Sequence, residues 1–91
     1  IWLDMSEFKY DLAVIGLGYV GLPLAIEAAN NTLKVVGYDI NDSVISSLNK
    51  SVSHVEDISD ESLNDTLSKE LTFTSDSNVL GDSEHIVISV P

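Results

Sequence analysis

Three glycines have the spacing that most directly suggests chemistry in this sequence. Gly16, Gly18 and Gly21 follow the apolar run at residues 12–15 and precede an alanine-rich stretch with helical periodicity. In a strand, turn and helix of this kind, the first glycine allows a sharp turn and the second lets the backbone approach a phosphate. The third allows the helix to pack closely on the strand. The pattern therefore predicts a turn that holds the pyrophosphate of a dinucleotide.

The residues inside this turn supply the expected hydrogen-bond donors. The first N–H groups of a helix have no partner within the helix, and the helix dipole is positive at that end, so an anion is favoured there. We expect the backbone N–H groups of Tyr19 and Val20 to face the phosphates. The alternative for Tyr19 is a residue that only packs against other side chains.

A carboxylate follows the second apolar strand pattern. Asp39 comes directly after residues 34–38 and lies roughly 20 residues beyond the last glycine, as expected for the acidic residue that binds the adenosine ribose. Its oxygens would accept hydrogen bonds from the ribose hydroxyls and would repel a 2′-phosphate. Since no arginine lies near Asp39, NAD is favoured over NADP. The alternative is that Asp39 only caps the next turn or helix.

Hydrophobic periodicity predicts an α/β fold, a Rossmann-like parallel sheet with flanking helices. One helix is expected at residues 19–30, a second after a cap at Asn41 or Asp42, and a third after a cap at Ser59 or Asp60. Residues 51–58 form a loop in this prediction, and residues 78–81 form a short helical turn. Strands are predicted at residues 10–15, 34–38, 71–75 and 85–90, the last of them buried.

The length limits how much of such a domain is present. The chain has 91 residues, whereas a doubly wound dinucleotide-binding domain has six strands. At roughly 30 residues for each strand and helix unit, the chain accommodates about half of them. We therefore expect residues 1–91 to be a truncated N-terminal NAD-binding domain, with a complete single-domain protein as the alternative. Met5 is a candidate natural start, and residues 1–5 are expected to be disordered or foreign to the natural protein.

Charge and composition exclude several classes of function. The net charge of −11 opposes binding to nucleic acid or to an anionic membrane. No stretch reaches the ~20 apolar residues of a membrane-spanning helix. The N-terminus lacks the pattern of a signal peptide, so a cytoplasmic location is expected. The sequence has no cysteine, so it contains neither a disulfide nor a thiolate metal site.

The remaining candidates for chemistry are weaker. His54 and His85 have no partner at a metal-ligand spacing, so no metal site is expected. We expect His54 to be a solvated loop residue, with an approach to a ligand as the alternative, and His85 to be an ordinary residue at the edge of a strand. Glu56 and Asp57 are adjacent, and neighbouring side chains usually diverge, so a loop or cap role is favoured over acid–base catalysis.

Four segments of the sequence are distinctive: IGLGYVGLPLA at residues 15–25, VGYDIN at 36–41, LTFTSD at 71–76 and VISVP at 87–91. With them, the sequence resembles the UDP-glucose/GDP-mannose dehydrogenase family of NAD-dependent nucleotide-sugar 6-dehydrogenases. The resemblance extends over nearly all of residues 10–91. It departs from the family at residues 49–51, Asn-Lys-Ser, where a glycine is usual, although asparagine also tolerates left-handed backbone angles.

The resemblance implies an activity and its site. Family members oxidise the C6 alcohol of a UDP-sugar to the uronic acid in two NAD-dependent steps, which supplies precursors for polysaccharide synthesis. A cysteine nucleophile, helped by lysine and asparagine, traps the aldehyde as a thiohemiacetal. Because this sequence lacks cysteine, the resemblance places these groups after Pro91, and the fragment alone is expected to be inactive. Val90 and Pro91 are expected to border the nicotinamide ribose at the carboxyl end of their strand.

The loop sequence refines the expected substrate. Ser-His-Val-Glu-Asp-Ile at residues 53–58 is similar to a segment of enzymes that act on UDP-N-acetylmannosamine or UDP-N-acetylglucosamine, and UDP-glucose is the second choice. The resemblance also implies a homo-oligomeric full-length parent. Two other hypotheses stay open: a non-catalytic dinucleotide-binding module, which the absence of cysteine suggests, and a different Rossmann dehydrogenase.

Overall fold

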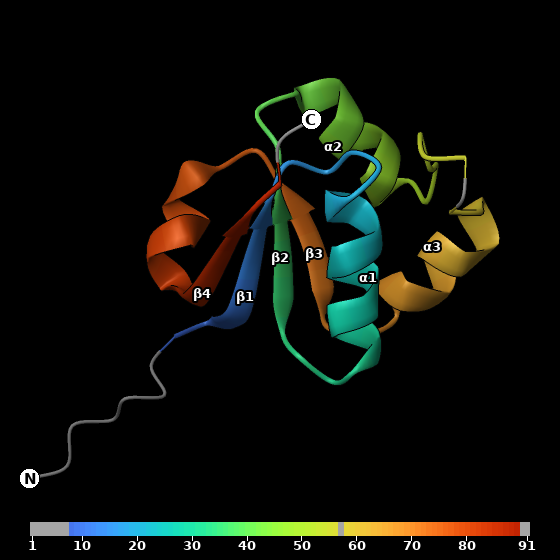
Figure 1. Ribbon diagram of the computed structural model, residues 1–91. Helices are drawn as coiled ribbons and strands as arrows, with labels where there is room; N and C mark the ends of the chain where they lie inside the picture. Colours follow the sequence, from blue (N-terminus) through green and yellow to red (C-terminus); the bar gives the residue numbers. More distant parts are fainter. Residues whose placement is uncertain (1–7, 57, 90–91) are drawn as a thin grey trace, which may run out of the picture.

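The chain folds around a four-stranded parallel sheet. The computed structural model describes residues 8–56 and 58–89. The strand order is β3-β2-β1-β4. In Figure 1, helices α1, α2 and α3 lie on one side of the sheet, and the short helix η1 lies next to β4. The strands are β1 (Tyr10–Ile15), β2 (Val35–Tyr38), β3 (Leu71–Thr74) and β4 (Ser83–Ile88). The helices are α1 (Gly21–Asn30), α2 (Asp42–Asn49), α3 (Asp60–Leu67) and the 3₁₀ helix η1 (Ser77–Asp82).

Strand β1 lies between β2 and β4, and its bounds are those predicted. Ala13 and Val14 point to opposite faces of the sheet and neither has any exposed surface. The register pairs Ile15 with Tyr38 on one side and with Ile88 on the other. The carboxyl ends of β1, β2 and β4 therefore lie together at one edge of the sheet, where open α/β sheets bind ligands.

The hydrophobic core lies between one face of the sheet and the three α-helices. On the strand side, Val14, Val35 and Phe73 belong to the core cluster. The helices and the loop after α2 contribute apolar residues at helical spacing, as the periodicity predicts. Those residues are Leu22, Ala25, Ile26 and Ala29 of α1, Ile45 and Leu48 of α2, Val55 of the loop, and Leu63 of α3. The element order and this layering confirm the predicted Rossmann-like α/β fold.

Side chains cap every helical segment except α1. Asn41 accepts hydrogen bonds from the backbone of α2, Ser59 from α3 and Asp76 from η1. The first of the two alternatives predicted for α2 and for α3 is therefore correct in each case. The N-cap of α1 is Val20, which has no side-chain acceptor. Helix α1 begins at Gly21 rather than at the predicted Tyr19, because the chain is still turning at Tyr19.

Helices α1 and α2 end in the same backbone arrangement. Thr32 after α1 and Ser51 after α2 have positive φ angles of 70° and 62°. In each case their N–H groups and those of the next residue bond back to the last turn, as in the Schellman motif. The left-handed residue after α2 is thus Ser51, and not the neighbouring asparagine. The chain therefore turns after α2 without a glycine.

The prediction that the last strand is buried is wrong. Strand β4 runs over Ser83–Ile88 rather than residues 85–90, and Ile86, Val87 and Ile88 are 47%, 37% and 66% exposed. Its apolar sequence is that of an interior strand, yet in the described part of the chain β4 pairs only with β1. Helices α1 to α3 pack over β1, β2 and β3, so they leave β4 uncovered.

Candidate functional site

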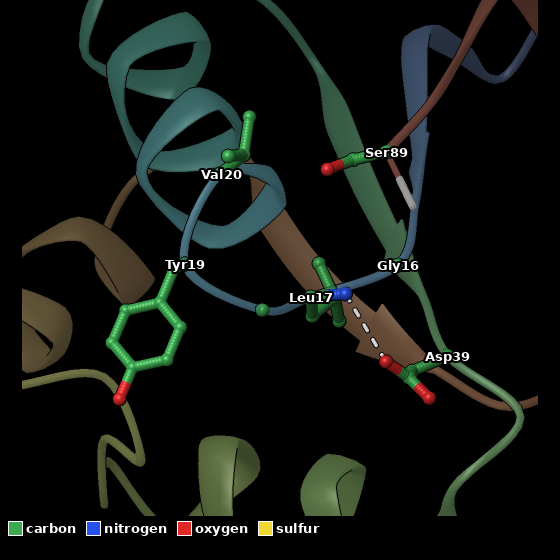
Figure 2. Close-up of a pocket in the computed structure, with 7 residues that line it drawn as sticks. Gly16, Leu17, Tyr19, Val20, Asp39 and Ser89 are labelled. Carbon is green, nitrogen blue, oxygen red and sulfur yellow. Dashed lines mark hydrogen bonds between the residues drawn. The ribbon is translucent and has the colours of Figure 1, made fainter. Parts of the chain in front are cut away.

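A pocket of about 320 Å³ opens where the carboxyl ends of β1, β2 and β4 meet. The predicted glycine turn and the predicted carboxylate both contribute to its wall, although they come from different strands. Figure 2 shows the turn arching from the end of β1 to the start of α1, with the carboxylate below it. The lining residues are Gly16, Leu17, Gly18, Tyr19, Val20, Asp39 and Ser89.

Two of the glycines are required by the fold. Gly16 has a φ angle of +92°, which other residues rarely adopt, and a Cβ atom there would overlap the carbonyl oxygen of Ser89. A Cβ atom at Gly21 would overlap the carbonyl oxygen of Gly16. The close contact at Gly21 is therefore with the turn itself and not, as predicted, with the strand. Because Ser89 donates its N–H to the carbonyl of Ile15, the chain after β4 lies directly beside the turn.

Gly18 differs from the other two glycines. Its φ angle is not in the left-handed region, and a Cβ atom there would have no atom of the described chain within 4 Å. The residue is exposed and lines the pocket. Neither backbone conformation nor internal packing explains a glycine here, so the open space at Gly18 faces whatever occupies the pocket.

The start of α1 presents unpaired donors to the same pocket. The N–H groups of Gly18, Tyr19 and Val20 have no acceptor among the described residues. The side chains of Tyr19 and Val20 are 70% and 69% exposed, and in Figure 2 they point away from each other on either side of the turn. The backbone between them is therefore accessible. This is the arrangement in which a helix N-terminus binds a phosphate.

Asp39 connects the end of β2 to the turn. One carboxylate oxygen accepts the N–H of Leu17 at 3.1 Å, which Figure 2 marks by a dashed line, and the other accepts the N–H of Asn41 at 3.0 Å. Each oxygen has a second lone pair, so both can still accept a hydroxyl donor. The cap alternative is also partly correct, because the bond to Asn41 closes the turn that precedes α2.

Three residues of the site were missed from the sequence. Leu17 is 1% exposed, and its backbone lines the pocket. Ser89 lines the pocket and lies directly beside the turn. His54 is exposed in its loop, as expected, and its Nε2 also contacts the backbone oxygen of Leu17 at 2.5 Å, a contact that was not predicted. Ser89 could have been predicted, because it follows the carboxyl end of the last strand, where open α/β sheets bind ligands. No local pattern predicts the contact of His54, because Leu17 lies 37 residues away in the sequence.

The other predicted residues lie away from this pocket or outside the described residues. Val90, Pro91 and Asp57 fall outside them, as do residues 1–5. His85 is exposed within β4, where it stands 3.9 Å from Glu84, rather than before the strand. Glu56 is exposed in its loop. Five of the eight predicted cofactor residues therefore line the pocket, and a sixth, Gly21, lies directly against the turn.

The described residues offer neither a metal centre nor a membrane span. Over residues 8–56 and 58–89, no group of three or more His, Cys, Asp or Glu side chains is placed to hold a metal ion. Within the same part of the chain, every helix is too short to cross a bilayer.

Comparison with known proteins places this geometry in context. The model of the UDP-glucose/GDP-mannose dehydrogenase family, NAD binding domain, matches residues 10–91. Protein CapL of Staphylococcus aureus is 37% identical over 81 residues, which are 89% of this chain and 18% of that protein. A UDP-N-acetyl-D-glucosamine 6-dehydrogenase of Salmonella typhi is 38% identical over 80 residues, 88% of this chain and 18% of that enzyme.

The solved structures agree with the sequence comparison. The structure of a UDP-D-ManNAc dehydrogenase from Pyrococcus horikoshii superimposes with a TM-score of 0.80 and 42% identity, over 87% of this chain and 19% of that one. The chain thus spans about a fifth of the length of these relatives. The family match over residues 10–91 includes the glycine turn and every strand and helix described above.

Proposed function

The chain belongs to the UDP-glucose/GDP-mannose dehydrogenase family, and on that premise we propose that its pocket holds NAD for a UDP-sugar 6-dehydrogenase. The parent enzyme would oxidise the C6 alcohol of the sugar to the uronic acid in two steps, for polysaccharide precursor synthesis. In each step NAD would accept a hydride from C6 of the sugar. The single observation that carries the proposal is the uncapped start of α1 beside the open Gly18 and the carboxylate of Asp39.

The chain's own residues suit the pyrophosphate and the adenosine ribose of the cofactor. The free N–H groups of Gly18, Tyr19 and Val20 suit the pyrophosphate, and the space at Gly18 allows close approach. The spare lone pairs of Asp39 suit the 2′- and 3′-hydroxyls of the ribose. A 2′-phosphate would meet this carboxylate, so we propose NAD rather than NADP as the cofactor. We also propose that Val90 and Pro91, which follow Ser89 of the pocket wall, border the nicotinamide ribose.

The names of the relatives support a substrate subgroup. Relatives in Salmonella typhi and Pseudomonas aeruginosa are UDP-N-acetyl-D-glucosamine 6-dehydrogenases, and one in Pyrococcus horikoshii is a UDP-N-acetyl-D-mannosamine dehydrogenase. We propose a UDP-N-acetylhexosamine as the substrate of the parent enzyme, ahead of UDP-glucose. The loop at residues 53–58 supports the same choice.

Several features of the whole protein follow as part of the proposal. The chain has no cysteine, so the nucleophile that attacks the aldehyde would come from sequence outside residues 1–91, and these residues alone would not catalyse the oxidation. The parent enzyme would be a cytoplasmic homo-oligomer. The net charge of −11 argues against nucleic acid as a partner.

Cofactor binding tests the proposal directly. Calorimetry on the full-length protein should show NAD binding at least about tenfold tighter than NADP. Gly18→Val should weaken NAD by more than about tenfold, because the side chain fills the space needed by the pyrophosphate, and Asp39→Ala should weaken it by removing the ribose acceptor.

A matched variant controls for the glycine substitution. Gly81→Val also places a side chain at an exposed glycine with no atom within 4 Å, but it lies in η1, away from the pocket. Its NAD affinity should equal that of the wild type. Unchanged affinity in both Gly18→Val and Asp39→Ala would contradict the site, and NAD binding without sugar oxidation would favour a non-catalytic binding module.

A further inference from the structure

Both polar backbone groups of Leu17, its N–H and its C=O, are held by side chains from elsewhere in the chain. Its N–H donates to Asp39, as Figure 2 shows, and its carbonyl oxygen is 2.5 Å from Nε2 of His54. A carbonyl can only accept, so Nε2 of His54 must carry the proton. These two contacts come from different elements, the end of β2 and the loop between α2 and α3. The glycine turn is therefore fixed from two sides.

The loop that carries His54 is itself well anchored. The next residue, Val55, is 2% exposed and belongs to the hydrophobic core. On the other side, the backbone N–H of Ser53 donates to Asp60 at 2.8 Å, and the Ser53 hydroxyl bonds the backbone of Val55. These contacts fix the backbone on both sides of His54. His54 as a whole is exposed, but the hydrogen bond from its ring to Leu17 is partly buried.

Holding the carbonyl of Leu17 also sets the direction of the next N–H group. The described chain has no cis peptide bond, and in a planar trans peptide the N–H points opposite to the C=O. Because the Leu17 oxygen points to His54, the N–H of Gly18 points away from that loop. The two following residues, Tyr19 and Val20, continue the turn from this fixed peptide plane.

From this geometry we propose that His54 is a positioning residue for the cofactor. It donates a hydrogen bond to Leu17 that orients the Leu17–Gly18 peptide and, with it, the N–H groups that receive the pyrophosphate. The inference rests on the proposed function, since it names a second layer of the same NAD site. It assigns His54 no contact with the cofactor or with the sugar.

Two substitutions of similar shape separate the hydrogen bond from the volume of the ring. His54→Gln keeps an N–H donor near the position of Nε2, whereas His54→Met has a similar length and no donor. Val52→Met is the matched control, because Val52 lies in the same loop, 48% exposed. In the full-length protein we would measure the Kd of NAD by calorimetry, the KM values of NAD and of the sugar nucleotide, and the thermal midpoint.

The expected pattern is specific to a positioning role. His54→Met should weaken NAD about five- to tenfold, the effect of one lost hydrogen bond, with the KM of the sugar nucleotide unchanged. His54→Gln should recover most of that loss, and Val52→Met should match the wild type. A Kd for His54→Met within twofold of the wild type would overturn the proposal. So would equal losses in His54→Gln and His54→Met, or an equal loss in Val52→Met.

Failure of this inference is distinguishable from failure of the proposed function. If wild-type protein does not bind NAD, or if Gly18→Val binds it as well as the wild type, the site assignment itself is wrong. If Gly18→Val loses NAD while His54→Met keeps it, the site stands and only the positioning role of His54 is refuted.

Discussion

The glycine turn after β1 and the ends of α1 and α2 all contain a residue with a positive φ angle, but the residue types differ. Gly16 in the turn has a φ angle of +92°, and Thr32 and Ser51 after the helices have φ angles of 70° and 62°. In the turn, backbone atoms occupy the space that a Cβ would need. At the helix ends the residues are at the surface or partly buried, and side chains are accommodated.

The difference separates two reasons for using glycine. A left-handed backbone angle alone costs a residue with a Cβ about 1–2 kcal/mol, which a folded domain can tolerate at a helix end. Overlap with a backbone oxygen cannot be relieved by a rotamer change, so Gly16 and Gly21 cannot be replaced in the same way. Gly18 belongs to neither group, because the chain itself leaves space there.

The largest effect is expected at Gly21. In Gly21→Ala the new Cβ overlaps the carbonyl oxygen of Gly16, and the free energy of unfolding should fall by about 3 kcal/mol, at the upper end of overpacking effects. Urea denaturation followed by circular dichroism measures it. Gly81→Ala, which meets no atom within 4 Å, is the control. A loss below about 1 kcal/mol in Gly21→Ala would show that overlap with a backbone oxygen costs no more than a left-handed backbone angle.

A gain is expected at the end of α1. Thr32 is exposed, and its branched side chain is held at a positive φ angle, so Thr32→Gly should raise the free energy of unfolding by about 1 kcal/mol. The same denaturation assay measures the gain. Asn30→Gly, two residues earlier within α1, should lower stability by about 0.5 kcal/mol, because glycine is the poorer helix former and the hydrogen bond from Lys69 to the Asn30 side chain is lost. Losses of stability in both variants would show that Thr32 has a role beyond ending the helix.

The smallest change in stability is expected at Gly18. Because its φ angle is not left-handed and its surroundings are open, Gly18→Ala should alter the free energy of unfolding by less than about 0.5 kcal/mol. Its NAD affinity should nevertheless fall, in contrast to Gly81→Ala. A variant that is both stable and fully able to bind NAD would leave the glycine at this position unexplained.

The sequence predicted most of the fold because the signals for its elements are local. Strand β1 has the predicted bounds, and Asn41 and Ser59 cap their helices as the residue types suggest. The prediction that the final strand is buried was wrong. Apolar periodicity reports the tendency of β4 to form a strand, but burial depends on which elements pack against it, and none of α1 to α3 does.

The sequence by itself determined the glycine turn, the carboxylate at the end of β2 and the order of the elements. These depend on backbone conformation and on spacing along the chain, and both are determined by residues close together in the sequence. Only the tertiary structure decided that Ser89 lines the pocket, that Asp39 and His54 hold the N–H and the C=O of Leu17, and that β4 is exposed. Each of these depends on residues that are distant in sequence and become neighbours only when parallel strands align their carboxyl ends at one edge of the sheet.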